Sequence, residues 1–544
     1  MHISQIHPAS SSSIDHSIRK VLLHGSSRRP NRRVPARDVR LTRTVTGMRT
    51  PLPALVATLG LLATGLTGLA IAPAASAFEP SLTYVDCPDG VKPASTKCAE
   101  LTVPLDWQTP DDGRTTKIAL RVIPSARGGG GFTFNPGGPG GSGIDFGEFV
   151  HSDLPRQVRD RFDFVMWDPR GVGLSGPKLT GCGAMPDPDL PLTGAVDWEK
   201  AWSEYAVATG AVLSDCFAKN PDSAPYLGTW QVVRDMEAMR IALGYPRWNF
   251  WGMSYGTRIA YTYAKTFPDS LRTVIVDGSL WPQESVYRLS SQQPMAWQTA
   301  LQVYSSVMGR AQTRKFEQIL EVLDDTYIET AEGSITRWSF SGSVFGALGS
   351  QAAYSGIRDG INALYDALVG QPSTQTRKAA VRAVEALDDP EPDLSESLLF
   401  SFINCADLHD RPTPEMAGRV AASAARDYGT TFATATSVIT SCQGLPADYS
   451  PPVPSDWATI ELATPPVVVL SLGDRATPWL WGKIMANQYA GSRLINYNSS
   501  QHVTYMSTPS TCVNDPVTRY LLRRQLPPNN VFCSFVPSLP PPQE

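Results

Sequence analysis

The sequence predicts an α/β fold with a mainly parallel central sheet and an inserted helical domain. Short apolar runs typical of buried parallel strands alternate with stretches of helical periodicity in the first half of the 544-residue chain. This alternation stops between about residues 282 and 444, where the pattern is mostly helical, and resumes afterwards. One apolar run, at 248–253, ends in the pentapeptide Gly252-Met253-Ser254-Tyr255-Gly256.

The first 77 residues have the composition of a leader and signal peptide. They contain ten Lys or Arg and two Asp, whereas the rest of the chain has 37 basic and 49 acidic residues. An uncharged apolar segment, 52–72, precedes Ala75-Ser76-Ala77, the small-residue pattern that a signal peptidase cleaves. We expect a secreted protein that begins after Ala77, and Met48 is an alternative start of the chain.

A membrane anchor is the alternative to cleavage, because segment 52–72 is nearly long enough to span a bilayer. After cleavage no stable membrane association is expected. The acidic balance of the mature chain argues against nucleic acid as a partner.

All eight cysteines follow residue 77, and an even number in an exported chain indicates disulfides. Pairing between sequence neighbours is the simplest hypothesis, although the sequence alone does not fix the connectivity. The pairs are then Cys87 with Cys98, Cys182 with Cys216, Cys405 with Cys442, and Cys512 with Cys533. The sequence contains no CxxC or Cys/His cluster with metal-ligand spacing, so no metal site is expected.

A glycine-rich segment follows the third of four expected strands, which lie at 101–104, 118–123, 131–134 and 162–167. It reads Asn135-Pro136-Gly137-Gly138-Pro139-Gly140-Gly141-Ser142-Gly143. Glycine at this density lets backbone N–H groups approach a substrate, as an oxyanion hole requires. The alternative is a flexible linker, but two prolines stiffen the segment and a strand leads directly into it.

The pentapeptide around Ser254 lies between an expected strand at 248–253 and an expected helix at 257–267. In α/β-hydrolases this pattern is the nucleophile elbow, where the flanking glycines permit a strained turn. Ser254 is therefore the candidate nucleophile, and an ordinary serine turn is the alternative. The backbone N–H groups of Tyr255 and Gly138 are the expected oxyanion donors.

The remaining elements complete the predicted sheet. A helix over 229–243 leads to the strand before Ser254, and a further strand is expected at 272–277. Asp168 and Arg170 follow the strand at 162–167, and we expect them to hold loops together rather than to take part in chemistry. Amphipathic runs at 316–322, 380–387 and 394–402 indicate a helical cap over the active site, with an independent domain as the alternative. Strands resume at 465–472 and 492–497.

A histidine is the expected general base, and the chain after residue 77 contains only three. His502 follows the last expected strand, as the order serine, acid, histidine requires. His151 and His409 are interpreted as surface or hydrogen-bonded histidines.

Two aspartates compete for the role of the acid. Asp474 ends a strand and lies one helix and one strand before His502. Asp277 also ends a strand, but we favour Asp474 and interpret Asp277 as a cap for the turn that follows it.

The segments NPGGPGGSG, DPRGVGLS, GMSYGT and GDRATP and the final histidine, in this order behind a signal peptide, resemble the secreted actinobacterial tripeptidyl aminopeptidase family. That family is related to proline iminopeptidases and includes exported proteases and esterases. The resemblance covers nearly all of the mature chain, and it implies Ser254 as nucleophile, Asp474 as acid and His502 as base. One position departs from the family's pattern, because Gln501 stands where the family usually has glycine before the histidine.

Together these observations divide the chain into five segments. They are 1–77, leader and signal peptide; 78–285, hydrolase core, first part; 286–444, helical cap; 445–538, hydrolase core, second part, with the TAP-like C-terminal region; and 539–544, a proline-rich tail.

The expected function is that of an exported serine exopeptidase that releases short peptides, such as tripeptides, from free N termini. Asp407 in the cap is a candidate to hold the substrate's α-ammonium group. The alternatives are a carboxylesterase or lipase-like enzyme with the same triad, and a silent binding protein on the same scaffold. The proposed site implies no cofactor, and the oligomeric state is not predicted.

Overall fold

The computed structural model describes residues 78–282, 284–331, 333–387 and 394–537, and it contains a sheet of ten strands. The strands are β1 (Ser81–Val85), β2 (Lys97–Pro104), β3 (Thr115–Ile123), β4 (Gly131–Asn135), β5 (Asp163–Trp167), β6 (Trp248–Met253), β7 (Leu271–Asp277), β10 (Val467–Ser471), β11 (Arg493–Tyr497) and β12 (Val531–Cys533). Their order is β1-β2-β3-β5-β4-β6-β7-β10-β11-β12. The expected leader at 1–77 and the expected tail at 539–544 lie outside the described residues.

The sheet is parallel from β5 to β12, and only the pairs β1/β2, β2/β3 and β3/β5 are antiparallel. Each strand expected from the sequence is present, with ends that shift by a few residues. The prediction of a mainly parallel sheet is therefore confirmed.

Two apolar layers enclose the sheet, because successive side chains of a strand point to opposite faces. In β6, Trp248 and Phe250 lie in one apolar cluster with residues of α5 (Thr229–Ala242) and α6 (Gly256–Thr266). Trp251 and Met253 lie in the other cluster, with residues of α2 (Gly143–Asp153) and α15 (Thr511–Arg523). The helices that flank the sheet are α2 (Gly143–Asp153), α3 (Arg156–Arg159), α5 (Thr229–Ala242), α6 (Gly256–Thr266), α14 (Trp479–Asn487) and α15 (Thr511–Arg523), with the 3-10 turns η1 (Ala224–Tyr226) and η2 (Pro268–Ser270).

Between β7 and β10 the chain is mostly helical, and we call residues 286–444 the cap. Its elements are α7 (Val286–Met308), α8 (Arg310–Leu323), β8 (Ile328–Glu329), β9 (Ser334–Ile335), α9 (Arg337–Ala347), η3 (Gln351–Ala353), α10 (Tyr354–Tyr365), η4 (Asp366–Gly370), α11 (Thr374–Glu385), α12 (Leu394–Asp407), α13 (Pro414–Tyr428) and η5 (Thr430–Thr440). Helices α7 to α11 share an apolar core of their own.

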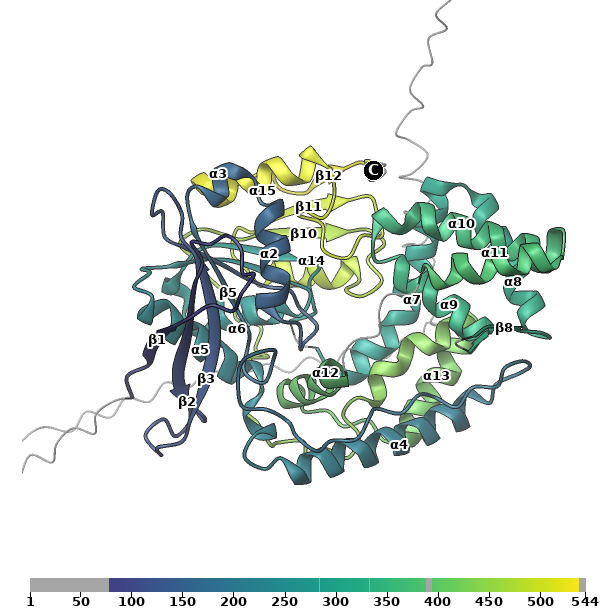
Figure 1. Ribbon diagram of the computed structural model, residues 1–544, viewed down its shortest axis with the longest axis horizontal. Helices are drawn as coiled ribbons and strands as arrows, with labels where there is room; N and C mark the ends of the chain where they lie inside the picture. Colours follow the sequence, from purple (N-terminus) through teal and green to yellow (C-terminus); the bar gives the residue numbers. More distant parts are fainter. Residues whose placement is uncertain (1–77, 283, 332, 388–393, 538–544) are drawn as a thin grey trace, which may run out of the picture. The chain divides into compact units, whose positions relative to one another are not determined.

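A long helix that the sequence analysis did not anticipate, α4 (Trp198–Lys219), packs along α13 of the cap (Figure 1). The buried indoles of Trp198 and Trp202 lie in one apolar cluster with Ala417 and Ala421. Conversely, α12 packs on α5, and its Phe402 belongs to the main core beside the sheet. One helix from the core segment thus packs on the cap, and one helix from the cap segment packs on the core. The segment boundaries drawn from the sequence remain a prediction.

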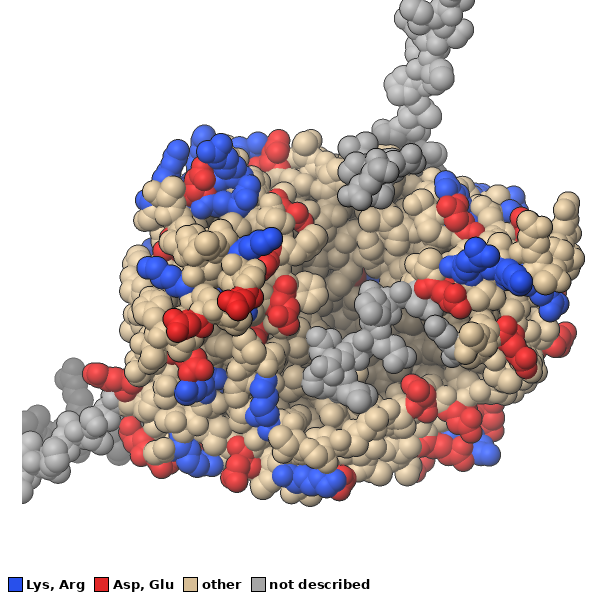
Figure 2. All heavy atoms as spheres, in the orientation of Figure 1, with Lys and Arg blue, Asp and Glu red and all other residues tan. Residues whose placement is uncertain are grey.

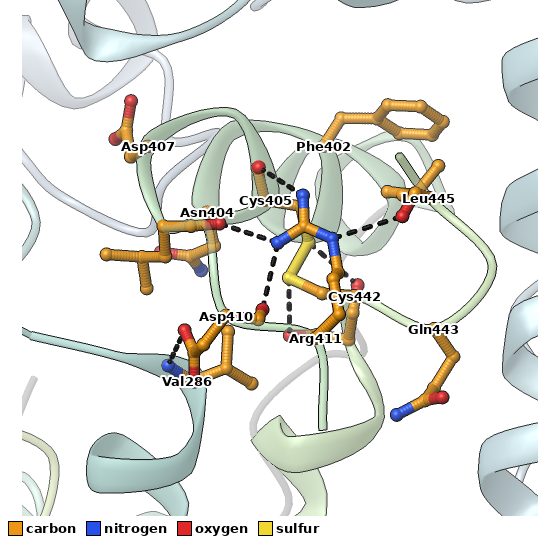
Figure 3. Close-up of a disulfide and its surroundings, with 12 residues drawn as sticks. Val286, Phe402, Asn404, Cys405, Asp407, Asp410, Arg411, Cys442, Gln443 and Leu445 are labelled. Carbon is orange, nitrogen blue, oxygen red and sulfur yellow. Dashed lines mark hydrogen bonds between the residues drawn. A yellow bond between two sulfur atoms is a disulfide. The ribbon is translucent and has the colours of Figure 1, made fainter. Parts of the chain in front are cut away.

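Four disulfides join the cysteines in the pairs expected for sequence neighbours. Figure 3 shows Cys405–Cys442, which links the end of α12 to the segment after η5. Beside it, Arg411 donates hydrogen bonds to the carbonyl oxygens of Cys405 and Leu445. The neighbour-pairing hypothesis is confirmed.

The face shown in Figure 2 is hollowed between the sheet-bearing part and the cap, and most residues on the visible walls carry no charge. Within the described ranges, none of the helices combines the length and apolar character needed to cross a bilayer.

Candidate active site

The turn at Ser254 has the geometry of a nucleophile elbow. β6 ends at Met253 and α6 begins at Gly256, and between them Ser254 has a φ of 50°, which is rare for a residue with a side chain. A Cβ on Gly252 would lie 2.3 Å from the carbonyl oxygen of Gly256, so this position cannot hold a side chain. The Ser254 N–H donates to the carbonyl oxygen of Asp277 at 3.0 Å, which fixes the turn against β7.

The glycine-rich segment packs directly on Ser254. Gly137 has a φ of 107°, and a Cβ built there would lie 2.7 Å from Ser254 Cβ and 3.3 Å from its Oγ. Asn135 Oδ1 accepts a hydrogen bond from the Gly137 N–H at 3.1 Å and holds the start of the segment. Gly138 follows Gly137 in the chain, and Tyr255 follows Ser254. Their roles as oxyanion donors remain a prediction.

Asp474 and His502 form a hydrogen-bonded pair. His502 Nδ1 lies 3.0 and 2.9 Å from the two carboxylate oxygens of Asp474. Since a carboxylate only accepts, Nδ1 carries the proton, and Nε2 is an acceptor in the neutral ring. The imidazole lies against Gly278, where a Cβ would be 3.2 Å from His502 Cε1. Gly278 directly follows Asp277, whose carbonyl oxygen binds the Ser254 N–H. The Asp474–His502 pair therefore lies beside the elbow.

Thr477 is a site residue that the sequence analysis missed. Its hydroxyl donates to Asp474 Oδ2 at 2.8 Å and lies 3.4 Å from His502 Nδ1. Asp474 Oδ1 also accepts from the N–H groups of Ala476 and Thr477, both at 2.9 Å. The carboxylate is thereby fixed in one orientation. The sequence pattern that could have revealed Thr477 is its position three residues after Asp474, from which a threonine hydroxyl can bond the aspartate side chain.

Whereas the ring of His502 is bonded to Asp474, the carboxylate of Asp277 is hydrogen-bonded to the backbone that follows His502. Its two oxygens accept from the N–H groups of Thr504 at 2.9 Å and Tyr505 at 2.8 Å. The interpretation of Asp277 as a cap for its own following turn is therefore wrong. Burial raises the pKa of this carboxyl to about 7, although the two backbone donors and His502 lower it.

The residue between His502 and this anchor is strained. Val503 has a φ of 61°, a conformation that β-branched residues rarely adopt. Such strain persists only where surrounding contacts hold it. The hydrogen bonds from Thr504 and Tyr505 to Asp277 are contacts of this kind.

Of the other two histidines, His409 is exposed and hydrogen-bonded, as the sequence analysis expected, whereas His151 is half-buried. His151, on α2, packs against Phe164 with 5.3 Å between ring centroids. Burial, with the charge of Arg159, lowers its pKa to about 4, so it is neutral at pH 7. His409 Nε2 lies 3.3 Å from the carbonyl oxygen of Ser450.

Asp407 is a buried structural carboxylate, and the expectation that it binds a substrate ammonium group is not supported. It accepts from the Thr229 N–H at 2.7 Å, from the Thr229 hydroxyl at 2.6 Å and from Arg258 Nη1 at 2.7 Å. Its side chain has no exposed surface. Both oxygens are thus already used, and the carboxylate joins α12 of the cap to helices α5 and α6.

Asp168 and Arg170 have the loop-holding roles predicted for them. Asp168 accepts hydrogen bonds from Ser142 and from the Leu174 N–H, while the fully buried Arg170 pairs with Asp235 at 2.6 Å. In the described part of the chain, no group of three or more His, Cys, Asp or Glu is arranged to hold a metal ion.

Residues 132–321 match the family described as alpha/beta hydrolase fold, and residues 428–533 match the family described as TAP-like protein. With the parallel sheet and the elbow, these matches define the protein as an α/β-hydrolase. Its relatives include "Serine protease Hip1" of Mycobacterium tuberculosis, 29% identical over 472 residues that cover 81% of this chain and 88% of that protein. The two matches and these relatives support the TAP family of α/β-hydrolases for this chain, and the chain is a serine hydrolase, as the sequence predicted.

Two further relatives are similar over most of their length. "Tripeptidyl aminopeptidase" of Streptomyces lividans is 27% identical over 505 residues, which cover 86% of this chain and 89% of that protein. "Carboxylesterase B" of M. tuberculosis is 26% identical over 533 residues, which cover 89% of this chain and 99% of that protein.

Proposed function

We propose that the protein is an exported serine exopeptidase that cleaves short peptides from free N termini through an acyl-enzyme on Ser254. The observation that carries this proposal is the Asp474–His502 hydrogen bond beside a serine held at a φ of 50° between a strand and a helix. A serine hydroxyl is a weak nucleophile until an oriented base accepts its proton. His502, with Asp474 behind it, has the chemistry of that base.

In the proposed reaction, Ser254 Oγ attacks the scissile carbonyl carbon while its proton passes to His502 Nε2. The N–H groups of Gly138 and Tyr255 stabilise the negative charge on the carbonyl oxygen. His502 then donates the proton to the leaving amine, which leaves an acyl-enzyme. Water attacks this ester and gives its proton to His502, and the peptide acid departs as Ser254 regains its proton.

The substrate class is proposed from the relatives and from the cap. The names of two relatives, a serine protease and a tripeptidyl aminopeptidase, support a peptide substrate. A helical cap over the hollowed face would limit how much of a peptide can enter beyond the scissile bond. A carboxylesterase activity is the second candidate, because a relative of that name is 26% identical over 89% of this chain.

Export is proposed from the leader and from the cysteines. All eight cysteines are paired, and stable disulfides form in oxidising compartments. An export test compares the mature N terminus of protein recovered from the culture medium with the expected start at Phe78. Retention of the protein in the cell with residues 1–77 attached contradicts export.

A fluorophosphonate probe tests the nucleophile. We expect the wild type to be labelled and Ser254→Ala not to be labelled. Ser152→Ala, at an exposed serine whose hydroxyl bonds Phe149 on the surface of α2, is the matched control and should label as the wild type does. Equal labelling of wild type and Ser254→Ala contradicts the assignment and returns the silent binding protein as the better hypothesis.

A substrate panel then separates the two activities. Chromogenic amides of one, two and three residues with free N termini are compared with the same peptides acetylated at the N terminus and with short-chain esters. The proposal expects turnover of the free peptides and little of the acetylated ones. Rapid ester hydrolysis without amide turnover favours the carboxylesterase.

A further inference from the structure

The loop that carries His502 is docked on one segment of the cap, residues 348–354. The Ser500 N–H donates to the hydroxyl of Tyr354 at 3.0 Å, and the Ser500 hydroxyl donates to the carbonyl oxygen of Leu348. The His502 N–H donates to the carbonyl oxygen of Gly349 at 2.7 Å. Ser500 and the base His502 are thus both bonded to a part of the chain some 150 positions away.

Gln501 joins this segment to the backbone of His502 through its side-chain amide. Its Oε1 accepts from the Gln351 N–H at 2.9 Å, and its Nε2 donates to the carbonyl oxygen of His502, also at 2.9 Å. The residue is 6% exposed, so water does not readily replace either bond. The amide oxygen of Gln501 thus faces a backbone N–H, and its nitrogen faces a backbone carbonyl oxygen. Because an N–H only donates and a carbonyl oxygen only accepts, the amide has a single orientation here.

The backbone of His502 is therefore held from two sides. On the side after the strained Val503, the carboxylate of Asp277 binds the backbone of residues 504 and 505. On the side before Val503, the cap segment binds residues 500, 501 and 502. Within the described part of the chain, the imidazole of His502 is hydrogen-bonded to the side chains of Asp474 and Thr477 alone. The distance of Nε2 from Ser254 thus depends on where the cap segment holds this loop.

We propose that Gln501 is a positioning residue that couples the cap to the base: it transmits the position of residues 348–354 to His502 and so sets the alignment of the imidazole with Ser254. This rests on the proposed function of Ser254 and His502. A glycine at this position, which the family resemblance leads one to expect, has no side chain to make either bond. In this chain the placement of the cap is consequently part of the catalytic geometry.

Gln501→Met tests the proposal, because it keeps the volume of the side chain and removes both amide bonds. We expect kcat on the best substrate to fall about 10- to 100-fold, since misplacement of a reacting group by about 1 Å has effects of this size. KM should change less than threefold by the same reasoning. The rate of fluorophosphonate labelling should fall with kcat.

Gln443→Met is the matched control. Gln443 is also buried in the cap, and its side-chain amide donates to the carbonyl oxygen of Pro412. The control should lower the thermal midpoint as much as Gln501→Met does and leave kcat within twofold of the wild type. Equal losses of kcat in the two variants show a general effect of cap stability and overturn the proposal.

Tyr354→Phe provides a second test from the cap side if Gln501→Met does not fold. It removes the hydroxyl that binds Ser500 and should lower kcat severalfold without raising KM. Unchanged kcat in the folded variants overturns the positioning role. If His502→Ala itself retains activity, the proposed function fails instead, so the two failures are distinguishable.

Discussion

Asp277 ends β7 and Asp474 lies three residues after the end of the neighbouring strand β10, yet their carboxylates have different partners. Asp474 binds the ring of His502, while Asp277 binds the backbone two and three residues further on. The sequence indicated both as strand-end acids near the serine. Chain order favoured Asp474, but the direction of each side chain depends on how the loop at 499–506 folds back, and no local pattern encodes that.

The first prediction separates these two aspartates by their effect on turnover. Asp474→Asn should lower kcat by about 10³- to 10⁴-fold, because the tautomer and orientation of His502 are no longer fixed. Asp277→Asn should lower kcat only about tenfold, because the loop is loosened while the ring keeps its acid. Steady-state kinetics on one substrate measure both. A larger loss in Asp277→Asn reverses the assignment of the acid.

The second prediction concerns pH and Asp277. Its pKa is about 7 in the native state and about 3.9 in an unfolded chain, so between these values the native state holds a proton that the unfolded state has released. Rising pH therefore lowers the contribution of this group to the free energy of unfolding. The difference in thermal midpoint between wild type and Asp277→Asn should shrink from about pH 5 to about pH 8. A difference that grows over this range contradicts the prediction.

At the scale of elements, the contact between the glycine-rich segment and the elbow was foreseeable from sequence. Glycines at 137, 252 and 256 are required because neighbouring atoms occupy the space of a side chain. The elbow strand and helix were predicted within one residue of their ends. Helix α4 and the edge strands β1 and β12 were missed. β1 is mostly exposed and β12 has three residues, so neither carries the apolar run of a buried strand.

The third prediction tests this contact with Gly137→Ala. The new Cβ would stand 2.7 Å from Ser254 Cβ at a φ of 107°, so we expect at least about a 100-fold loss of kcat. Gly130→Ala is the matched control, because Gly130 has a φ of 100° and open space around its Cβ position. The control should lose stability through backbone strain and keep its kcat. Activity in Gly137→Ala equal to that of the control contradicts this account.

At the scale of the whole molecule, one disulfide within the cap, Cys405–Cys442, lies beside the contacts that join cap and core. Cys405 precedes Asp407, which binds Thr229 and Arg258 beneath the elbow, and Figure 3 shows Asn404 and Asp407 on the same turn as the disulfide. Loosening the end of α12 therefore disturbs a buried ion pair as well as the cap. Leaving one partner of such a pair unpaired costs about 3–5 kcal/mol.

The fourth prediction compares two disulfides. Replacing Cys405 and Cys442 by serine opens a loop of 37 residues and should lower the free energy of unfolding by about 4 kcal/mol on the chain-entropy estimate. Replacing Cys87 and Cys98 opens a loop of 11 residues and should cost about 3 kcal/mol. Only the first pair should also lower kcat, because only it adjoins the contacts under the elbow. Denaturant unfolding and steady-state kinetics of both variants check this, and equal activities refute it.

Helix α4 has a consequence for how such enzymes can be recombined. Trp198 and Trp202 of α4 share an apolar cluster with Ala417 and Ala421 of α13. In the sequence, α4 precedes Ser254 and α13 follows it by about 160 residues. Grafting residues 286–444 alone onto a related hydrolase would leave Ala417 and Ala421 uncovered. The smallest exchangeable unit is discontinuous, and a chimaera intended to alter substrate choice has to carry residues 197–220 with the graft.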